Sequence, residues 1–237
     1  MKFLYLKINL FCLLIPLLFS FHPRLKFHKT WYAFFPAVFI TAIYFILWDI
    51  YFTDHGVWGF NEEYVTGLTI INLPVEEMLF FFCIPYACVF TFHCLQVILK
   101  ATLPESTESK LTIALVVLLF ITGIICYRKI YTACTFISLA FLLAFLKYYL
   151  QVKWLGKFYI VYTMLLLPFL IVNGLLTGSF LEKPVVWYNA DAIIGTRIGT
   201  IPFEDIFYGM ELILMNIMIY LHLIHRNEVK KTATIPN

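Results

Sequence analysis

Seven long apolar runs constrain the fold of this chain more than any other feature. A helix needs about 17 to 25 residues to cross a bilayer, and each run has about that length. Hydrocarbon offers backbone groups no hydrogen-bond partner, so each run should be helical. The expected helices are 3–21, 31–52, 74–99, 111–127, 131–149, 158–177 and 202–224. The sequence therefore predicts an all-α membrane protein with seven transmembrane helices.

The composition supports this interpretation. Of the 237 residues, 62% are hydrophobic and only 13% are charged, and the mean hydropathy is +0.87. A soluble domain carries about a quarter charged residues, which is what it needs to cover a water-facing surface. The formal net charge is only +3, and the basic residues form short clusters between apolar runs. That pattern suits control of membrane topology and argues against nucleic acid as a partner.

The first run, "MKFLYLKINLFCLLIPLLFS", has the early lysines and the apolar stretch of a signal peptide. It lacks a small-x-small cleavage site, and it also fills a place in the repeat described below. We therefore expect the first helix to be retained.

Lysine and arginine are distributed unevenly between the two sets of connections. One side collects eleven: Arg24, Lys26, Lys29, Lys100, Lys110, Lys147, Lys153, Lys157, Arg226, Lys230 and Lys231. The other side collects six: Lys2, Lys7, Arg128, Lys129, Lys183 and Arg197. The positive-inside rule then predicts a multi-pass protein of the cell membrane with a cytoplasmic C-terminus and an outer N-terminus. The long loops 53–73 and 178–201 fall on the outer side.

The chain repeats itself after 128 residues. The segment "FNEEYVTGLTIINLPVEEMLFF" lies over "YNADAIIGTRIGTIPFEDIFYG". The aligned pairs are Asn61 and Asn189, Gly67 and Gly195, Pro74 and Pro202, Glu76 and Glu204, Glu77 and Asp205, and Phe80 and Tyr208.

Each half reads as a helix, a short basic loop, a second helix, a long loop and a third helix that begins Pro-x-Glu-acid. Helices 1 to 3 thus pair with helices 5 to 7, and helix 4 connects them. The expected divisions are a first repeat at 1–100, a connecting helix at 101–130, a second repeat at 131–225 and a cytoplasmic tail at 226–237. Four crossings separate the third helix from the seventh, so the repeats are parallel, related by a pseudo-twofold axis along the membrane normal.

The duplicated acids are the main candidates for chemistry. First-turn acids stabilise a helix by about 0.3–1 kcal/mol through its dipole, and that role alone does not require a duplicated pair. Neighbouring helix positions differ by about 100°, so only one acid of each pair can face the bundle squarely. We expect Glu76 and Glu204 to be the inward, catalytic members, because Glu stands there in both copies, with Glu77 and Asp205 in support.

Other polar residues near these acids are candidates for substrate contacts. Glu211 shares a helix face with Tyr208, and intramembrane acids are functional candidates by default. Asp49 and Asn173 end the second helix of each half, where they either lie beside the acids or mark an interfacial helix end. Arg197 is either a counter-charge to the second acidic pair or a solvated loop residue.

Several chemistries lack their motifs. The chain has no G-x-G-x-x-G signature for a nucleotide cofactor, no histidine boxes and no paired D-x-x-x-D motifs for magnesium. No metal and no cofactor are therefore expected. The cysteines lack metal-ligand spacing and are interpreted as small buried hydrophobes: Cys12, Cys83, Cys88, Cys94, Cys126 and Cys134. Acid–base chemistry on a lipid-soluble substrate remains.

The two acidic segments resemble a known family. The stretch "GTRIGTIPFEDIFYG", preceded by "VVWYN", and the stretch "LPVEEMLFFF", preceded by "WGFN", are similar to the flavin-independent integral-membrane lycopene cyclases. These occur as two small subunits or as one fused chain, and this sequence looks like the fused form. The resemblance covers both halves, without helix 4 and the tail.

The resemblance implies cyclisation of the ψ-ends of lycopene, through γ-carotene, to the β-rings of β-carotene, with no redox step. It also implies residue roles. Glu76 and Glu204 would be acid and base with Glu77 and Asp205 beside them, and Asn61, Asn189 and Arg197 would shape the site. The implied partners are lycopene or a related acyclic carotenoid, membrane lipid and, in association, other carotenoid enzymes.

Two alternatives of different classes stay open. Parallel repeats with intramembrane acids are also an arrangement of proton-coupled membrane transporters. A non-catalytic carotenoid-binding protein would need an apolar cavity but no acids.

Overall fold

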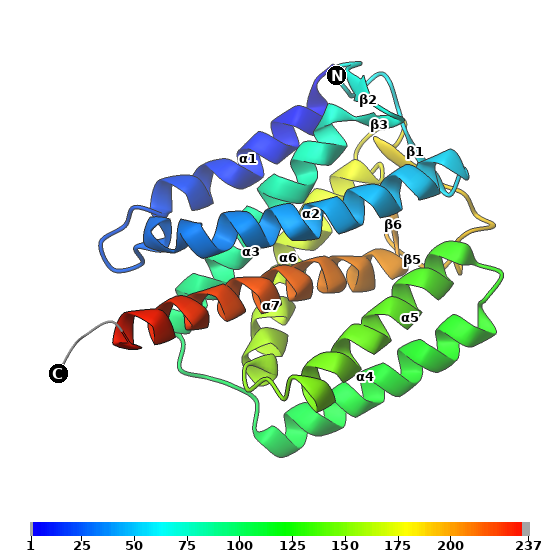
Figure 1. The fold of residues 1–237 in the computed structure, drawn as a ribbon. Coiled ribbons are helices and arrows are strands. Elements are labelled where there is room, and N and C mark those ends of the chain that lie inside the picture. The colour runs from blue at the N-terminus through cyan, green and yellow to red at the C-terminus, as the bar shows by residue number, and fades with distance from the viewer. Residues whose placement is uncertain (1, 234–237) are drawn as a thin grey trace.

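The computed structural model describes residues 2–233 and is mostly helical (Figure 1). Its α-helices within these residues are α1 (Leu4–Phe19), α2 (Trp31–Asp54), α3 (Val75–Ile98), α4 (Glu105–Ile125), α5 (Ile130–Ala144), α6 (Leu155–Leu176) and α7 (Glu204–Ala233). A 3₁₀ turn at Phe27–Thr30 precedes α2, and a π-helical turn at Phe145–Tyr149 extends α5.

Six helices, α2 to α7, are long and apolar enough to cross a membrane. The first helix, α1, is equally apolar but has only 16 residues. This set of helices makes the chain a multi-pass membrane protein, as its composition indicates. Every expected helix is present, so the all-α prediction is confirmed.

Two helix boundaries differ from those expected by more than three residues. The fourth helix begins at Glu105 instead of 111, because Pro104 supplies its N-terminal cap and the polar segment 105–110 forms its first turns. The last helix continues past 224 to Ala233, so most of the expected tail 226–237 is helical. The final part of that tail, 234–237, lies outside the described residues.

Short strands gather at the end of the bundle where α3 and α7 begin (Figure 1). The hairpin β2 (Thr69–Ile70) and β3 (Leu73–Pro74) leads into α3. Its counterpart, β5 (Arg197–Ile198) and β6 (Ile201–Pro202), leads into α7. The two halves meet through β1 (Trp58–Phe60) and β4 (Val186–Tyr188), which pair antiparallel with Gly59 opposite Trp187.

The hydrogen bonds around β1 and β4 are reciprocal. The Asn61 N–H donates to the Val185 carbonyl, and the Asn189 N–H donates to the Val57 carbonyl, both at 2.9 Å. Each residue of one bond lies 128 positions from its counterpart in the other. The two repeated halves are therefore joined about a local twofold axis that passes between Gly59 and Trp187.

The loops before α3 and α7 share unusual backbone angles. Gly67 and Gly195 have φ of 90° and 93°, a region that L side chains rarely adopt. Four residues further on, Ile71 and Gly199 have φ of 61° and 63°. The repeat is thus preserved in the backbone even where the side chain changes from glycine to isoleucine.

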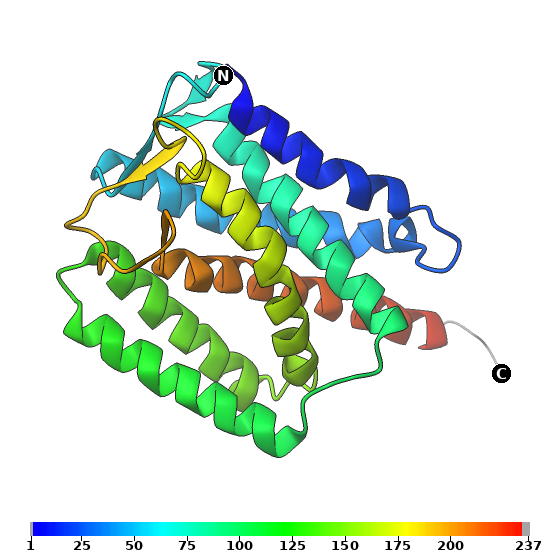
Figure 2. The same ribbon diagram turned by 180° about the vertical axis from the view of Figure 1, so that it is seen from behind.

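The helices pack unequally in the two halves. Within each half the first helix lies on the third, α1 on α3 and α5 on α7. The second helix α2 packs along both α3 and α7, whereas its counterpart α6 makes fewer contacts with α7 and α3. Figure 2 shows α6 crossing the back of the bundle beside α3. The fourth helix lies outside the repeat, against α5.

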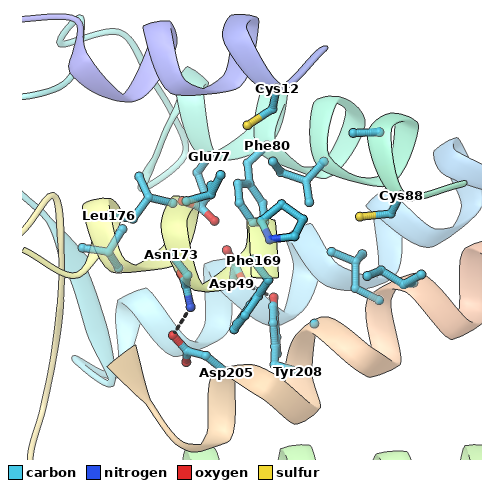
Figure 3. Close-up of a pocket in the computed structure, with 18 of the residues that line it drawn as sticks. Cys12, Asp49, Glu77, Phe80, Cys88, Phe169, Asn173, Leu176, Asp205 and Tyr208 are labelled. Carbon is cyan, nitrogen blue, oxygen red and sulfur yellow. Dashed lines mark hydrogen bonds between the residues drawn. The ribbon is translucent and has the colours of Figure 1, made fainter. Parts of the chain in front are cut away.

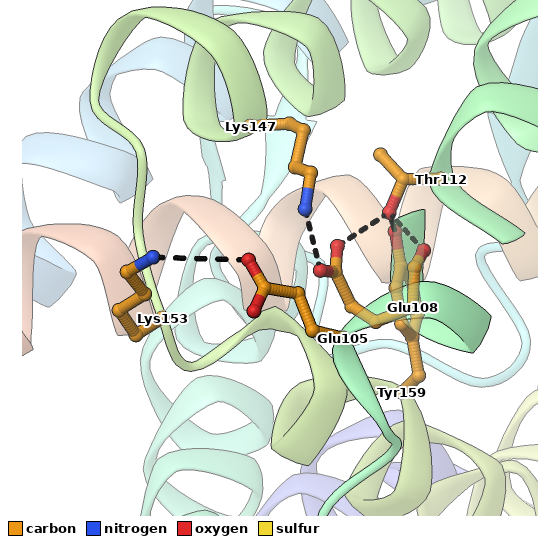
Figure 4. Close-up of polar contacts among 6 residues, drawn as sticks. All are labelled: Glu105, Glu108, Thr112, Lys147, Lys153 and Tyr159. Atoms are coloured by element: carbon orange, nitrogen blue, oxygen red, sulfur yellow. Dashed lines mark hydrogen bonds and ion pairs between the residues drawn. The ribbon is translucent and has the colours of Figure 1, made fainter. Parts of the chain in front are cut away.

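A polar cluster joins the start of α4 to its neighbours (Figure 4), at the end of the bundle away from the strands (Figure 1). Lys147, in the π-helical turn after α5, forms an ion pair of 2.6 Å with Glu108 of α4. The Glu108 side chain is only 8% exposed. Thr112 donates to Glu108 at 2.9 Å and contacts the Tyr159 hydroxyl of α6 at 2.8 Å. Lys153 and Glu105 form a looser, exposed pair at 3.9 Å.

Candidate active site

An apolar cavity of about 150 Å³ lies between α3, α6 and α7, below the β1–β4 ladder. Most of its wall is aliphatic and aromatic. Three carboxyl groups point into it: Asp49 of α2, Glu77 of α3 and Asp205 of α7 (Figure 3). All three side chains are buried. Acids in such a cavity require hydrogen-bond partners, and each has them.

The first acidic group combines Glu77 and Asp49. The Tyr5 hydroxyl of α1 donates to Glu77 Oε2 at 2.6 Å. Asp49 lines the same cavity, and its carboxyl group interacts electrostatically with that of Glu77. Two carboxylates that share a buried site repel each other, so such a pair favours keeping a proton on one member. The Tyr208 hydroxyl, from the other half of the chain, donates to Asp49 Oδ1 at 2.8 Å.

The second acidic group is Asp205, which accepts three hydrogen bonds. The Tyr131 hydroxyl of α5 donates to Oδ1 at 2.7 Å. Oδ2 accepts from the Asn173 amide of α6 at 2.8 Å and from the Tyr188 hydroxyl of β4 at 3.0 Å. A carboxylate that receives three hydrogen bonds from neutral donors is well suited to act as an acceptor in its ionised form.

Tyr188 lies outside the membrane-spanning helices, yet its ring is enclosed. Burial, together with the negative charge of Asp205, raises the pKa of Tyr188 well above its ordinary value. Its hydroxyl therefore remains a proton-bearing donor to Asp205.

The tyrosines of α1 and α5 are equivalent members of the repeat. Tyr5 and Tyr131 each donate to the second acid of the Pro-x-Glu-acid motif, Glu77 and Asp205 respectively. Their backbone N–H groups bond in the same way to the loop before the third helix of each half. Sequence comparison missed both tyrosines, because they are 126 rather than 128 residues apart. An alignment of α1 with α5 would have found them.

Glu76 and Glu204 point away from the cavity. The Thr66 N–H donates to Glu76 Oε1, and the Ile194 N–H donates to Glu204 Oε1, both at 2.6 Å. The second carboxyl oxygen of each glutamate is buried without a protein partner. These side chains hold the two loops against the starts of α3 and α7.

The orientation within each acidic pair is thus the reverse of the one expected. The 100° step between neighbours does separate the two side chains, but Glu77 and Asp205 face the cavity. The loops fix the rotation of each helix about its axis, because a backbone N–H ten residues upstream donates a hydrogen bond to the first acid of each pair.

Three loop residues expected near the site lie outside the cavity. The Asn61 side chain accepts from the Glu63 N–H at 3.0 Å, and the Asn189 side chain accepts from the Asp191 N–H at 2.9 Å. Arg197 donates to the Thr200 carbonyl at 2.6 Å and is exposed. It is a solvated loop residue and makes no ion pair with the second acidic pair.

The helix residues expected near the site divide into two groups. Asp49, Asn173 and Tyr208 all line the cavity. Glu211 is buried on another face of α7, where it accepts from Ser138 of α5 at 2.7 Å. Its counterpart position holds Cys83, one of six free cysteines.

The geometry suits proton transfer to a hydrocarbon. Among residues 2–233, no group of three His, Cys, Asp or Glu side chains is arranged to hold a metal ion. Aromatic rings from both halves surround the acids, including Trp58 and Tyr208 with centroids 6.1 Å apart. Aromatic faces attract cations, so the cavity brings buried carboxyl groups together with a wall that suits a cation.

Comparison of the sequence with models of known protein families assigns the chain to one family. The model of the lycopene cyclase family matches residues 2–95 and 128–223, which correspond to the two repeated halves. No curated protein and no solved structure matches the chain. The family match covers most of the sequence and confirms the resemblance found in the acidic segments. This protein belongs to the lycopene cyclase family.

Proposed function

We propose that this cyclase converts the ψ-ends of lycopene to β-rings, through γ-carotene to β-carotene. Family membership supports a cyclase acting on a carotenoid. The observation that carries the finer proposal is the group of three buried acids inside an apolar cavity, because cyclisation of an alkene needs a proton but no redox equivalent.

The reaction begins with proton transfer from a carboxylic acid to C2 of the terminal double bond. A tertiary cation forms at C1. The π electrons of the C5–C6 double bond attack C1, so the C1–C6 bond forms and the positive charge moves to C5. A base then removes the proton from C6, and its electrons form the new C5–C6 double bond. Substrate and product are isomers.

The Asp49–Glu77 pair is the proton donor in this proposal. Both carboxyl groups are buried in the same cavity, where repulsion between like charges favours keeping one proton on the pair, next to the space a ψ-end would fill. Asp205 is the base or the anionic stabiliser of the cation, because three donors hold it as an acceptor. Glu76 and Glu204 act indirectly, by positioning the loops.

The chain would cross the membrane seven times, with α1 as a short first span. Two parallel repeats, α1 to α3 within 1–100 and α5 to α7 within 131–225, are joined by α4 within 101–130. The equivalent β-hairpins before α3 and α7 support this arrangement. The distribution of basic residues supports an orientation in the cell membrane with the strand end outside and the C-terminus in the cytoplasm.

The test is expression in a host that accumulates lycopene, followed by chromatography of the pigments. We expect γ- and β-carotene from the wild-type chain. Glu77→Gln and Asp205→Asn should each abolish cyclisation while the protein still inserts into membranes. Glu62→Gln, on the exposed part of the same loop region, is the matched control and should cyclise normally.

Unchanged lycopene in membranes that contain the wild-type protein would contradict the proposal. It would instead favour a transporter or a carotenoid-binding protein. Full activity in both cavity variants would remove Glu77 and Asp205 from the chemistry.

A further inference from the structure

The residues that line the cavity are related by the repeat near the acids, but not deeper in the helix bundle. Near the local twofold axis, lining residues come in equivalent pairs, such as Glu77 with Asp205 and Phe80 with Tyr208. Further into the bundle the lining comes from α6, including Tyr162, Leu165 and Phe169. The equivalent residues of α2 are packed and do not line the cavity. The cavity therefore extends from the acids in one direction, along α6.

One substitution between the repeats explains the difference. In the first half, Phe81 fills the space between α2 and α3, with its ring stacked 5.9 Å from that of Phe45. The equivalent positions in the second half are Gly209 and Phe169. A Cβ atom at Gly209 would already lie 3.3 Å from the Phe169 ring, so a side chain as large as that of Phe81 does not fit there without displacing the α6 residues that line the cavity.

The extension reaches the outer surface of the bundle. Cys12 of α1, Ile84 and Ala87 of α3, and Val172 of α6 line the cavity and are each partly exposed. Pro168 of α6 also lines it and is exposed. Figure 3 shows Cys12 and Cys88 on the side of the cavity away from Asp205. These helices face lipid, so the opening leads from the acids to the bilayer.

The size of the cavity fits one end group. A dry cavity of about 150 Å³ lined by aliphatic and aromatic residues holds a benzene-sized molecule. The cavity here, with its extension along α6 included, has about that volume, so it holds one ring and not a whole carotenoid. A polyene chain attached to that ring would leave the cavity through the opening beside α6.

We propose that the two halves build one reaction site with one lateral entrance, the groove along α6, which admits one ψ-end of the carotenoid at a time. This inference rests on the proposed cyclase function. Because the acids cannot reach both ends of a bound molecule, the monocyclic product leaves the groove and returns by its other end.

The release step is tested with purified protein in liposomes that contain isotopically labelled lycopene. A large excess of unlabelled lycopene is added once labelled γ-carotene has formed. Unlabelled molecules should compete for the groove, so conversion of labelled γ-carotene to β-carotene should slow by about tenfold. Unslowed conversion would show that both ends react without release and would overturn the proposal.

The entrance is tested by filling it. Gly209→Phe reproduces the Phe81 arrangement of the first half, and Ala87→Phe narrows the groove from the α3 side. Each should reduce consumption of lycopene and of γ-carotene to the same extent, by about tenfold or more. Leu118→Phe, on the exposed face of α4, is the matched control and should leave both rates unchanged.

The results separate the two proposals. Normal lycopene consumption with accumulation of γ-carotene in a filled variant would indicate two sites and overturn the single entrance. If both filled variants fail to insert into membranes, the experiment with excess unlabelled lycopene on wild-type protein still tests whether the monocyclic product is released. A wild-type chain that forms no cyclic product would contradict the cyclase function itself.

Discussion

The Tyr208 hydroxyl, on α7, donates a hydrogen bond of 2.8 Å to Asp49 on α2. These residues belong to different halves of the repeat. The bond therefore completes the acidic pair of the first half with a donor from the second. Its counterpart position in the first half is Phe80, which has no hydroxyl, so the contact exists once in the described structure.

Tyr208→Phe should lower the rate of lycopene consumption without preventing insertion. The variant removes a hydrogen bond to an acid, which is worth about 1.5–3 kcal/mol, or roughly a 10- to 100-fold change in rate. Rates in isolated membranes, normalised to protein, measure the effect. Tyr149→Phe removes an exposed hydroxyl and should change nothing; an unaltered rate in Tyr208→Phe would place the hydroxyl outside the mechanism.

Glu76→Gln and Glu204→Gln should keep most of the activity, in contrast to substitutions of the cavity acids. The amide oxygen of glutamine can still accept the Thr66 or Ile194 N–H, so the loops stay in place. Glu76→Ala and Glu204→Ala lose that acceptor and should unfold at lower temperature. Complete loss of cyclisation in the glutamine variants, with normal thermal stability, would return these residues to a catalytic role.

Gly59→Ala should destabilise the junction of the two halves. A Cβ atom there would lie 2.4 Å from the Trp187 ring. Such overpacking typically costs about 1–3 kcal/mol. Thermal unfolding in detergent measures the loss. A second substitution, Trp187→Ala, removes the clash and should restore part of the stability; no recovery would mean that the strain lies elsewhere.

Lys147→Met should destabilise α4 by leaving the Glu108 carboxylate without its partner. Loss of one member of a buried ion pair costs about 3–5 kcal/mol, and Lys147 is partly exposed, so we expect the lower end of that range. The double variant Lys147→Met, Glu108→Gln should recover stability. Neither residue lines the active-site cavity, so cyclisation by the inserted protein should be unchanged.

The exposed pair of Glu63 and Lys183 joins the long loops of the two halves at 2.6 Å. The hydrogen bond and charge of Lys183 lower the pKa of Glu63, and Glu63 likewise raises the pKa of Lys183. The stabilisation is therefore lost as pH falls through the lowered pKa of Glu63. It is also lost as pH rises through the raised pKa of Lys183.

The corresponding measurement is the unfolding midpoint of wild type minus that of Glu63→Gln over a range of pH. The difference should be largest near neutral pH, shrink in acid, and fall with added salt because both side chains are exposed. A constant difference across acid pH would show that the pair does not contribute.

Much of the fold could be predicted from the sequence, because each long apolar run has only one structure available to it in lipid. The acidic segments could also be located, since Pro74 and Pro202 mark helix starts. The rotation of those helices could not be predicted. Whether Glu76 or Glu77 faces inward depends on a backbone donor, Thr66, that the sequence does not connect with either acid.

The tyrosine donors were missed for a related reason. Helices α1 and α5 align with a shift of 126 residues, whereas Asp49 and Asn173, on α2 and α6, are 124 apart. Loop-length differences between the halves therefore hide equivalent positions. Tyr5 and Tyr131 become visible as a pair only when each helix is superposed separately.

The reciprocal bonds of the β1–β4 ladder mean that each half presents a strand whose partner is supplied by the other. A polypeptide cut in the connection between α3 and α4 would leave two fragments with mutually dependent edges. Neither fragment alone would hold Tyr208 against Asp49. This architecture therefore favours fragments that complement each other on co-expression over fragments that are stable separately.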